Sequence, residues 1–164
     1  MLRPALTHGV LLAALVLATQ TFVALGWLQP VEVSGDSMTP SLPPGERLLV
    51  RRTHAPQRWD TAVLRSPSDA RRLLVKRVVG LPGEEIQLRG GRVWVDGERA
   101  PTGNSSPARG VYYGAPGNPT WRLGRDEWLV LGDNQPASVD SRNWDAPPGL
   151  PGRLIVGVAS EPRN

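Results

Sequence analysis

Hydrophobic residues are distributed in two different ways along the chain. From Pro4 to Val31 there are 28 residues with no Asp, Glu, Lys or Arg. The apolar part, Leu6 to Leu28, would form a helix of about 34 Å at ~1.5 Å per residue, enough to cross a bilayer core of about 30 Å. After it, short runs rich in Val, Leu, Ile and Trp alternate with clusters of Gly, Pro, Asp and Asn, a pattern typical of strands and turns.

The first segment predicts a membrane anchor with a defined orientation. Arg3 precedes it and acidic residues follow it, so the positive-inside rule places residues 1–5 in the cytoplasm, 6–28 across the membrane and 32–164 outside. A cleaved signal peptide is the alternative, because Ala24-Leu25-Gly26 resembles a small-x-small cleavage site. The apolar stretch exceeds the roughly 7–15 residues of a signal core. We therefore expect a retained single-pass anchor in the cytoplasmic membrane, and trimming at Gly26 stays open.

The exported part is expected to be mainly β. Two alternating segments around Gly90-Gly91 predict a hairpin, and nothing after Leu28 has a convincing helical period. Residues 101–119 are rich in Gly, Pro, Asn and Ser and predict a variable excursion over the surface. We expect one compact, partly closed antiparallel β domain over 32–164. Its predicted strands are Arg47–Arg52, Asp60–Arg65, Leu73–Val79, Glu84–Arg89, Arg92–Asp96, Glu127–Leu131 and Arg153–Ala159.

Composition excludes several kinds of chemistry. The 164 residues contain no cysteine, so disulfides, thiol catalysis and cysteine-built metal sites are absent. With only His8 and His54, an all-histidine metal site is not expected, and we predict no metal or organic cofactor. The formal net charge is +4, but the arginines are scattered and form no nucleic-acid motif. We expect membrane lipid, not nucleic acid, as a partner.

One basic residue differs from all the others. Among 19 basic residues only Lys76 is a lysine, and lysine, unlike arginine, can lose its proton when it is desolvated. In the strand Leu73–Val79, alternation places Lys76 on one face with Leu74 and Val78, which should lower the pKa of its amine toward that of a general base. The alternative is a lysine whose head reaches water beside an apolar face.

Two polar loops offer partners for such a base. Ser37 lies in a short loop directly after the anchor, between Gly35 and Pro40, although Gly-Asp-Ser is also a common turn. The segment 131–142 supplies Ser138, which could orient the lysine amine, and also Asp140 and Arg142, which we expect to form a structural ion pair. A Ser-His-Asp triad through His54 is the competing arrangement, but His54 lies in a polar loop without supporting context.

Five segments, in this order, carry a resemblance to a known family: Ser34–Leu42, Arg58–Val63, Val75–Glu84, Leu131–Asn134 and Ser138–Arg142. With them the chain resembles bacterial signal peptidase I, the membrane-bound serine peptidase that removes signal peptides. The resemblance implies Ser37 as nucleophile, Lys76 as general base and Ser138 as the hydroxyl that positions the lysine, with Asp133, Asp140 and Arg142 as structural residues near the site. Relatives of the ER type have histidine in place of Lys76.

The chain departs from the family pattern at three places. Gly35 stands where some members carry a serine that assists the oxyanion hole, Leu74 stands where an aromatic residue is frequent, and Gln135-Pro136-Ala137 replaces charged residues. The oxyanion hole is therefore expected to rest on backbone N–H groups, including that of Ser37.

The resemblance implies a monomeric peptidase whose preprotein substrates carry small residues at the first and third positions before the cut. Two alternatives stay open: a relative dedicated to pilin or conjugation substrates, and a non-catalytic, membrane-anchored β domain that binds partners.

Overall fold

The structure, a computed structural model, describes residues 4–24, 27–101, 112, 120–144 and 149–160. Within these residues the chain forms one α-helix and eleven strands, and every strand pair is antiparallel. The prediction of a mainly β, antiparallel domain is confirmed. The elements are α1 (Pro4–Ala24), β1 (Leu28–Glu32), β2 (Arg47–Arg52), β3 (Thr61–Arg65), β4 (Leu73–Gly80), β5 (Glu85–Arg89), β6 (Arg92–Val95), β7 (Glu98–Arg99), β8 (Thr120–Arg122), β9 (Glu127–Leu131), β10 (Leu150–Pro151) and β11 (Ile155–Ser160).

The larger sheet has seven strands in the order β1-β2-β11-β3-β4-β9-β10. Strand β4 lies inside it, with Lys76 opposite Ala62 of β3 and Arg77 opposite Leu131 of β9. Alternate residues of β4 pack into different apolar clusters, with Leu74 and Val78 in one and Val75 in another. Lys76 therefore sits on a central strand whose two faces are both covered by protein.

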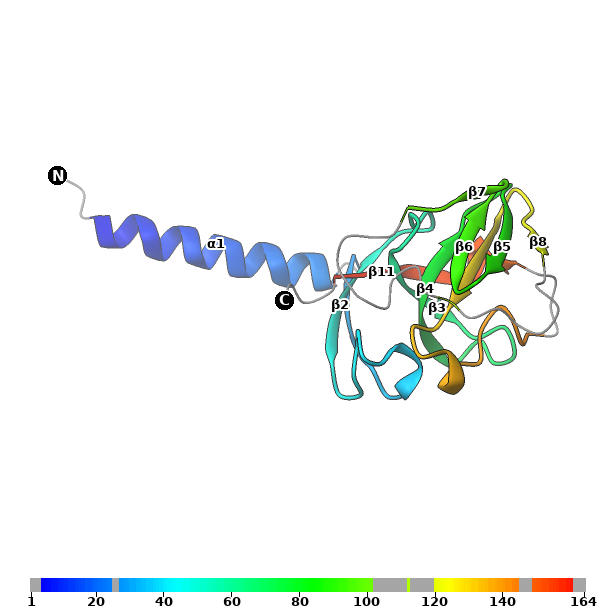
Figure 1. The fold of residues 1–164 in the computed structure, drawn as a ribbon. Helices are drawn as coiled ribbons and strands as arrows, with labels where there is room; N and C mark the ends of the chain where they lie inside the picture. Colours follow the sequence, from blue (N-terminus) through cyan, green and yellow to red (C-terminus); the bar gives the residue numbers. More distant parts are fainter. Residues whose placement is uncertain (1–3, 25–26, 102–111, 113–119, 145–148, 161–164) are drawn as a thin grey trace.

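The smaller sheet has four strands in the order β7-β6-β5-β8. Its centre is the predicted hairpin of β5 and β6, in which Gly90 and Gly91 both have positive φ, at 54° and 74°. Only glycine can occupy two successive positions with positive φ without steric cost. Figure 1 shows α1 projecting from the β domain, with the β5–β8 sheet on the side away from the helix.

All seven predicted strands are present, five of them with ends shifted by one or two residues, and four observed strands were not predicted. Strand β11 begins at Ile155, because Gly152–Leu154 form a 3-10 turn, so the strand predicted from Arg153 was wrong at its start. Strand β1 contains Pro30, which breaks a strand pattern but is tolerated on the edge of a sheet. Strands β7, β8 and β10 have only two or three residues each, too few to show alternation.

The N-terminal helix is shorter than the predicted membrane span. It ends at Ala24, and Leu28 instead begins β1, where it pairs with Arg51. The predicted span extended to Leu28 because hydropathy groups this residue with the apolar run. Hydropathy carries no information on strand pairing. Among the residues that the structure describes, no helix meets the length and hydropathy needed to cross a bilayer. The predicted excursion over 101–119 lies outside the described residues, apart from Pro101 and Tyr112.

Candidate active site

Ser37 is held in a short 3-10 turn, Asp36–Met38, by contacts on two sides. The Met38 side chain is fully buried and anchors the turn in the apolar core. The Asn134 backbone N–H donates to the Ser37 carbonyl oxygen at 2.9 Å, and its amide Nδ2 donates to the Asp36 carbonyl oxygen at 3.0 Å. The half-buried Ser37 is thus fixed against the loop that follows β9, although almost a hundred residues separate them.

Lys76 is buried in the middle of the protein, with a relative exposure of 3%. Its amine donates to the Ser138 hydroxyl at 3.2 Å. Burial lowers the pKa of Lys76 from its ordinary 10.5 to about 8. The Asp140 carboxylate opposes this, whereas the charges of Arg142 and Arg72 lower the pKa further. With this pKa, a minority of the molecules carry a neutral amine near neutral pH, and a neutral amine can accept a proton.

Behind Lys76, Ser138 connects the amine to a buried carboxylate. The Ser138 hydroxyl donates to Asp140 Oδ2 at 2.7 Å, and the Gly132 N–H donates to the same oxygen at 2.9 Å. Arg142 forms the predicted ion pair with Asp140, through Nε to Oδ1 and Nη2 to Oδ2, both at 2.8 Å. Burial alone would raise the pKa of Asp140, but the hydrogen bonds from Arg142, Gly132 and Ser138 bring it below its usual value. Asp140 is therefore a fixed anion at any pH near neutrality.

Gly132 lies between the Ser138 side chain and the Ser37 backbone, close to both. A Cβ atom there would clash with Ser138 Oγ and with the carbonyl oxygen of Ser37. Only a residue without a side chain lets the lysine-orienting loop approach the Ser37 turn this closely. Gly132 lies in one of the segments that carry the resemblance but was not predicted as a site residue.

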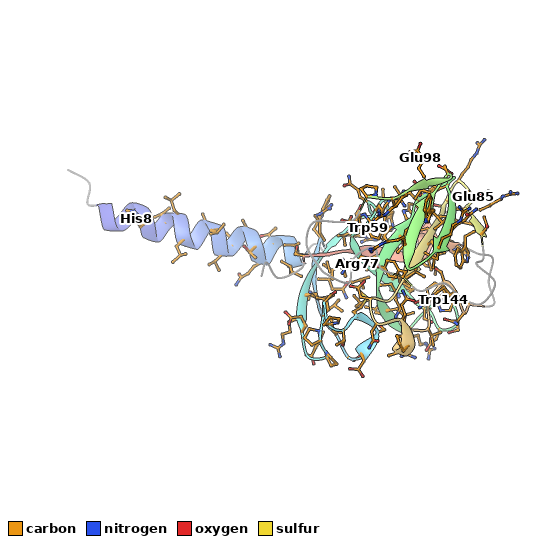
Figure 2. The ribbon with its side chains drawn as sticks, in the orientation of Figure 1. His8, Trp59, Arg77, Glu85, Glu98 and Trp144 are labelled. Carbon is orange, nitrogen blue, oxygen red and sulfur yellow. The ribbon has the colours of Figure 1, made fainter. Side chains whose placement is uncertain are left out.

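A second buried ion pair involves Arg77, the residue that follows Lys76 in β4. Arg77 and Asp133 have fully buried side chains, and the guanidinium contacts the carboxylate through Nη2 at 2.6 Å and Nε at 3.3 Å. Arg77 also donates to the Trp59 carbonyl oxygen at 3.0 Å and to Thr61 Oγ1 at 2.7 Å, and Tyr112 donates to Asp133 at 3.2 Å. Figure 2 shows Arg77 inside the domain beside Trp59. The pair ties β4 to the loop after β9.

Ser37 and Lys76 line the same pocket, whose volume is about 360 Å³. Among the described hydrogen bonds, none joins the Ser37 hydroxyl to the Lys76 amine, which donates to Ser138 instead. Catalytic hydrogen bonds are often loose in a ligand-free enzyme and tighten when substrate binds. Trp144, labelled in Figure 2, belongs to the pocket wall but was not among the predicted site residues. The full wall is formed by Val31–Met38, Ser66, Ser68, Arg72–Lys76, Ala137, Val139 and Trp144.

His54, the competing candidate base, does not share the pocket of Ser37. His54 lines a different pocket, from which Ser37 is absent, and its Nδ1 donates to the Ile155 carbonyl oxygen at 3.1 Å. The triad alternative therefore lacks a shared cleft.

Gly35, the position at which the chain departs from the expected oxyanion hole, has an extended backbone with φ −130°, and a Cβ there would meet no atom within 4 Å. In the described part of the chain, no group of three His, Cys, Asp or Glu side chains could hold a metal ion.

Comparison with known proteins identifies relatives along almost the whole chain. The family profile for signal peptidase, peptidase S26, matches residues 6–162. The chain is 34% identical to signal peptidase I of Leptolyngbya laminosa over 159 residues, covering 87% of this chain and 72% of the relative. It is 33% identical to probable signal peptidase I-1 of Synechocystis sp., covering 91% and 76%.

A solved structure gives the same result. The crystal structure of a signal peptidase I from Enterococcus faecalis matches with a TM-score of 0.50 and 26% identity, covering 64% of this chain and 97% of that one. With the fold, the profile and the sequence relatives in agreement, the chain belongs to the signal peptidase family, peptidase S26.

Proposed function

We propose that this protein is a serine endopeptidase that removes N-terminal signal peptides from exported proteins. The observation that carries the proposal is a buried amine, that of Lys76, which shares a pocket with Ser37 and whose pKa burial lowers to about 8. The similarity to proteins named signal peptidase I supports the reaction class and the substrate class.

In the proposed mechanism Lys76 is the general base. Its neutral amine, oriented by Ser138, accepts the proton of the Ser37 hydroxyl as Ser37 Oγ attacks the scissile carbonyl. Backbone N–H groups, including that of Ser37, stabilise the oxyanion, because Gly35 supplies no hydroxyl. The Lys76 ammonium then protonates the departing amine and leaves an acyl-enzyme. Water, deprotonated by Lys76, hydrolyses this ester and regenerates both side chains.

The contacts of the surrounding groups support the roles that we propose for them. Asp140 holds the Ser138 hydroxyl as a donor, which aims a lone pair of Ser138 at the lysine amine. Arg142 keeps Asp140 ionised, and Asp133 with Arg77 fixes the strand that carries Lys76. We assign structural roles to Asp133, Asp140 and Arg142. No step of this mechanism requires a cofactor.

We further propose the membrane arrangement expected from the sequence. Residues 6–28 would contain the anchor, residues 1–5 would be cytoplasmic, and 32–164 would form the extracytoplasmic peptidase domain. The absence of charge between residues 4 and 31 supports this arrangement. So do the exposed apolar side chains on α1, among them Leu11, Leu15 and Leu17 at 65–68% exposure, which would be stable in lipid.

The test is cleavage of a model preprotein with an Ala-x-Ala site by full-length protein in detergent. Ser37→Ala and Lys76→Arg should each abolish cleavage, the second because arginine cannot act as a base. Ser160→Ala is the matched control, since Ser160 is exposed at the end of β11, and it should cleave normally. Substantial activity in either site variant, at matched thermal stability, would contradict the Ser–Lys mechanism.

A further inference from the structure

A second pocket, unrelated to the peptidase chemistry, is strongly basic. It has a volume of about 240 Å³ and is lined by Gln29, Val50, Arg52, His54, Arg65, Arg153, Ile155 and Val156. Three of these eight residues are arginines and none is acidic, all within the described part of the chain. The positive charges of three arginines that line one hollow repel each other, so an anion bound in this hollow would be stabilising.

The arginines of this pocket have few other partners. No ion pair of the described residues involves Arg52, Arg65 or Arg153. Arg65 uses one N–H to donate to the Ala70 carbonyl oxygen at 3.1 Å, which leaves most of its donors available. Arginine presents its N–H groups in a planar fork that fits two phosphate oxygens. The pocket therefore has the chemistry of a phosphate site.

The connectivity of the chain places this pocket beside the end of α1. The Arg52 N–H donates to the Trp27 carbonyl oxygen at 3.0 Å, and Gln29, on the pocket wall, is the second residue of β1. Only four peptide units separate Ala24 from Leu28, which limits their separation to about 14 Å. Figure 1 shows α1 meeting the domain near β2 and β11, the strands that supply much of the pocket.

We infer that this pocket binds the phosphate of an anionic phospholipid headgroup, an inference that rests on the membrane anchor of the proposed function. If α1 spans the bilayer, Ala24 lies near the edge of the hydrocarbon core and the pocket falls in or next to the headgroup layer. Where this headgroup layer contains anionic lipid, the lipid attracts basic groups over a Debye length of about 8 Å. Trp27, which is 57% exposed between α1 and the pocket, is a residue type enriched at that depth.

The test measures retention of phosphatidylglycerol by the full-length protein. Wild type would be reconstituted in nanodiscs of phosphatidylcholine with a minor share of phosphatidylglycerol, and retained lipid counted by native mass spectrometry. The double variant Arg52→Gln/Arg153→Gln should retain phosphatidylglycerol on the order of tenfold less well, since each arginine near an anionic surface contributes a several-fold gain in binding. The matched control, Arg89→Gln/Arg99→Gln, removes the same charge from β5 and β7 and should behave as wild type.

Each other outcome has a defined meaning. Equal losses in both double variants would indicate nonspecific charge attraction and overturn the inference, as would a wild type without preference for phosphatidylglycerol. The same measurement in discs of phosphatidylcholine alone would use inorganic phosphate as the probe. If the wild type retained inorganic phosphate as well as it retains phosphatidylglycerol, the pocket would be a free-phosphate site instead. Preprotein cleavage in the same discs separates the two proposals. Cleavage without lipid preference overturns only this inference, and absent cleavage with lipid preference overturns only the peptidase.

Discussion

Replacing Lys76 by methionine should inactivate the protein and at the same time stabilise its fold. Methionine has a similar length and flexibility, carries no charge, and suits an apolar environment. The Ser138 hydroxyl would lose the lysine amine but keep its hydrogen bond to Asp140. The substitution therefore removes a buried titratable group and leaves no unpaired donor on Ser138.

The size of the effect follows from the pKa of Lys76. In the unfolded chain the amine titrates near 10.5, and in the folded protein burial lowers this value to about 8. At ~1.36 kcal/mol per pH unit, holding the protonated amine in the fold costs about 3 kcal/mol. The side chain is only 3% exposed, so little of this cost is relieved by solvent.

The effect has a definite pH dependence. Well below pH 8 both states of the wild type are mostly protonated, and nearly the full cost is present. Between about pH 8 and 10.5 the unfolded state binds more protons than the folded state, so wild-type stability rises with pH and the cost disappears. Lys76→Met cannot titrate. We expect it to be more stable than wild type by about 3 kcal/mol at pH 7 and to lose that advantage by about pH 10.5.

The assay is urea unfolding in detergent, followed by tryptophan fluorescence, for wild type and variant at several pH values. The difference between the two proteins cancels the other groups that titrate in both. A Lys76→Met protein that is less stable than wild type at pH 7, or a difference that does not change between pH 8 and 10.5, would refute the reasoning. The first result would mean that hydrogen bonding outweighs desolvation, and the second that the amine is already hydrated.

Three further predictions concern the same site. Ser138→Ala should lower kcat by on the order of 10²-fold through lost orientation of the amine, while Ser138→Thr retains more activity; an alanine variant with normal kcat would assign Ser138 to a turn only. Arg72→Gln should raise the pKa of Lys76, because the Arg72 charge lowers it, so the acidic limb of the pH profile of kcat/KM should move to higher pH; an unchanged or lower limb contradicts this. Gly132→Ala should reduce kcat and cost about 1–3 kcal/mol of stability by overpacking, measured by preprotein cleavage and thermal unfolding, and a fully active, stable variant would show that the two loops can separate freely.

The sequence predicted the elements whose pattern is local. Alternation identified β4 and placed Lys76 on a covered strand, and the Gly90-Gly91 pair located the hairpin. Strand β1 escaped because its evidence is non-local: only the pairing with β2 makes a segment containing Pro30 a strand. Element ends shifted where backbone turns decide them, as at Gly152–Leu154 before β11.

The residues of the proposed dyad were predicted from composition and resemblance, together with Ser138, Asp140 and Arg142 beside it. The contacts that bring the separate loops together were not predicted. The hydrogen bond from Asn134 to the Ser37 carbonyl oxygen and the close approach of Gly132 depend on two loops meeting across the fold. Trp144 and Arg72 join the pocket for the same reason. Such contacts leave no periodic trace in a sequence, because each depends on where another segment has been placed.

The solitary lysine in β4 also makes the chain its own reporter of unfolding. A protease that cuts only after lysine has one possible target in all 164 residues, and that target is in a central strand with 3% exposure. The folded protein should resist such a protease, and each cut in an opened β4 should yield the same two fragments, 1–76 and 77–164. When closing is fast relative to cutting, the rate at which they appear measures the population of the open state. A single band on a gel would then follow the stability of the strand that carries the proposed base, without any label.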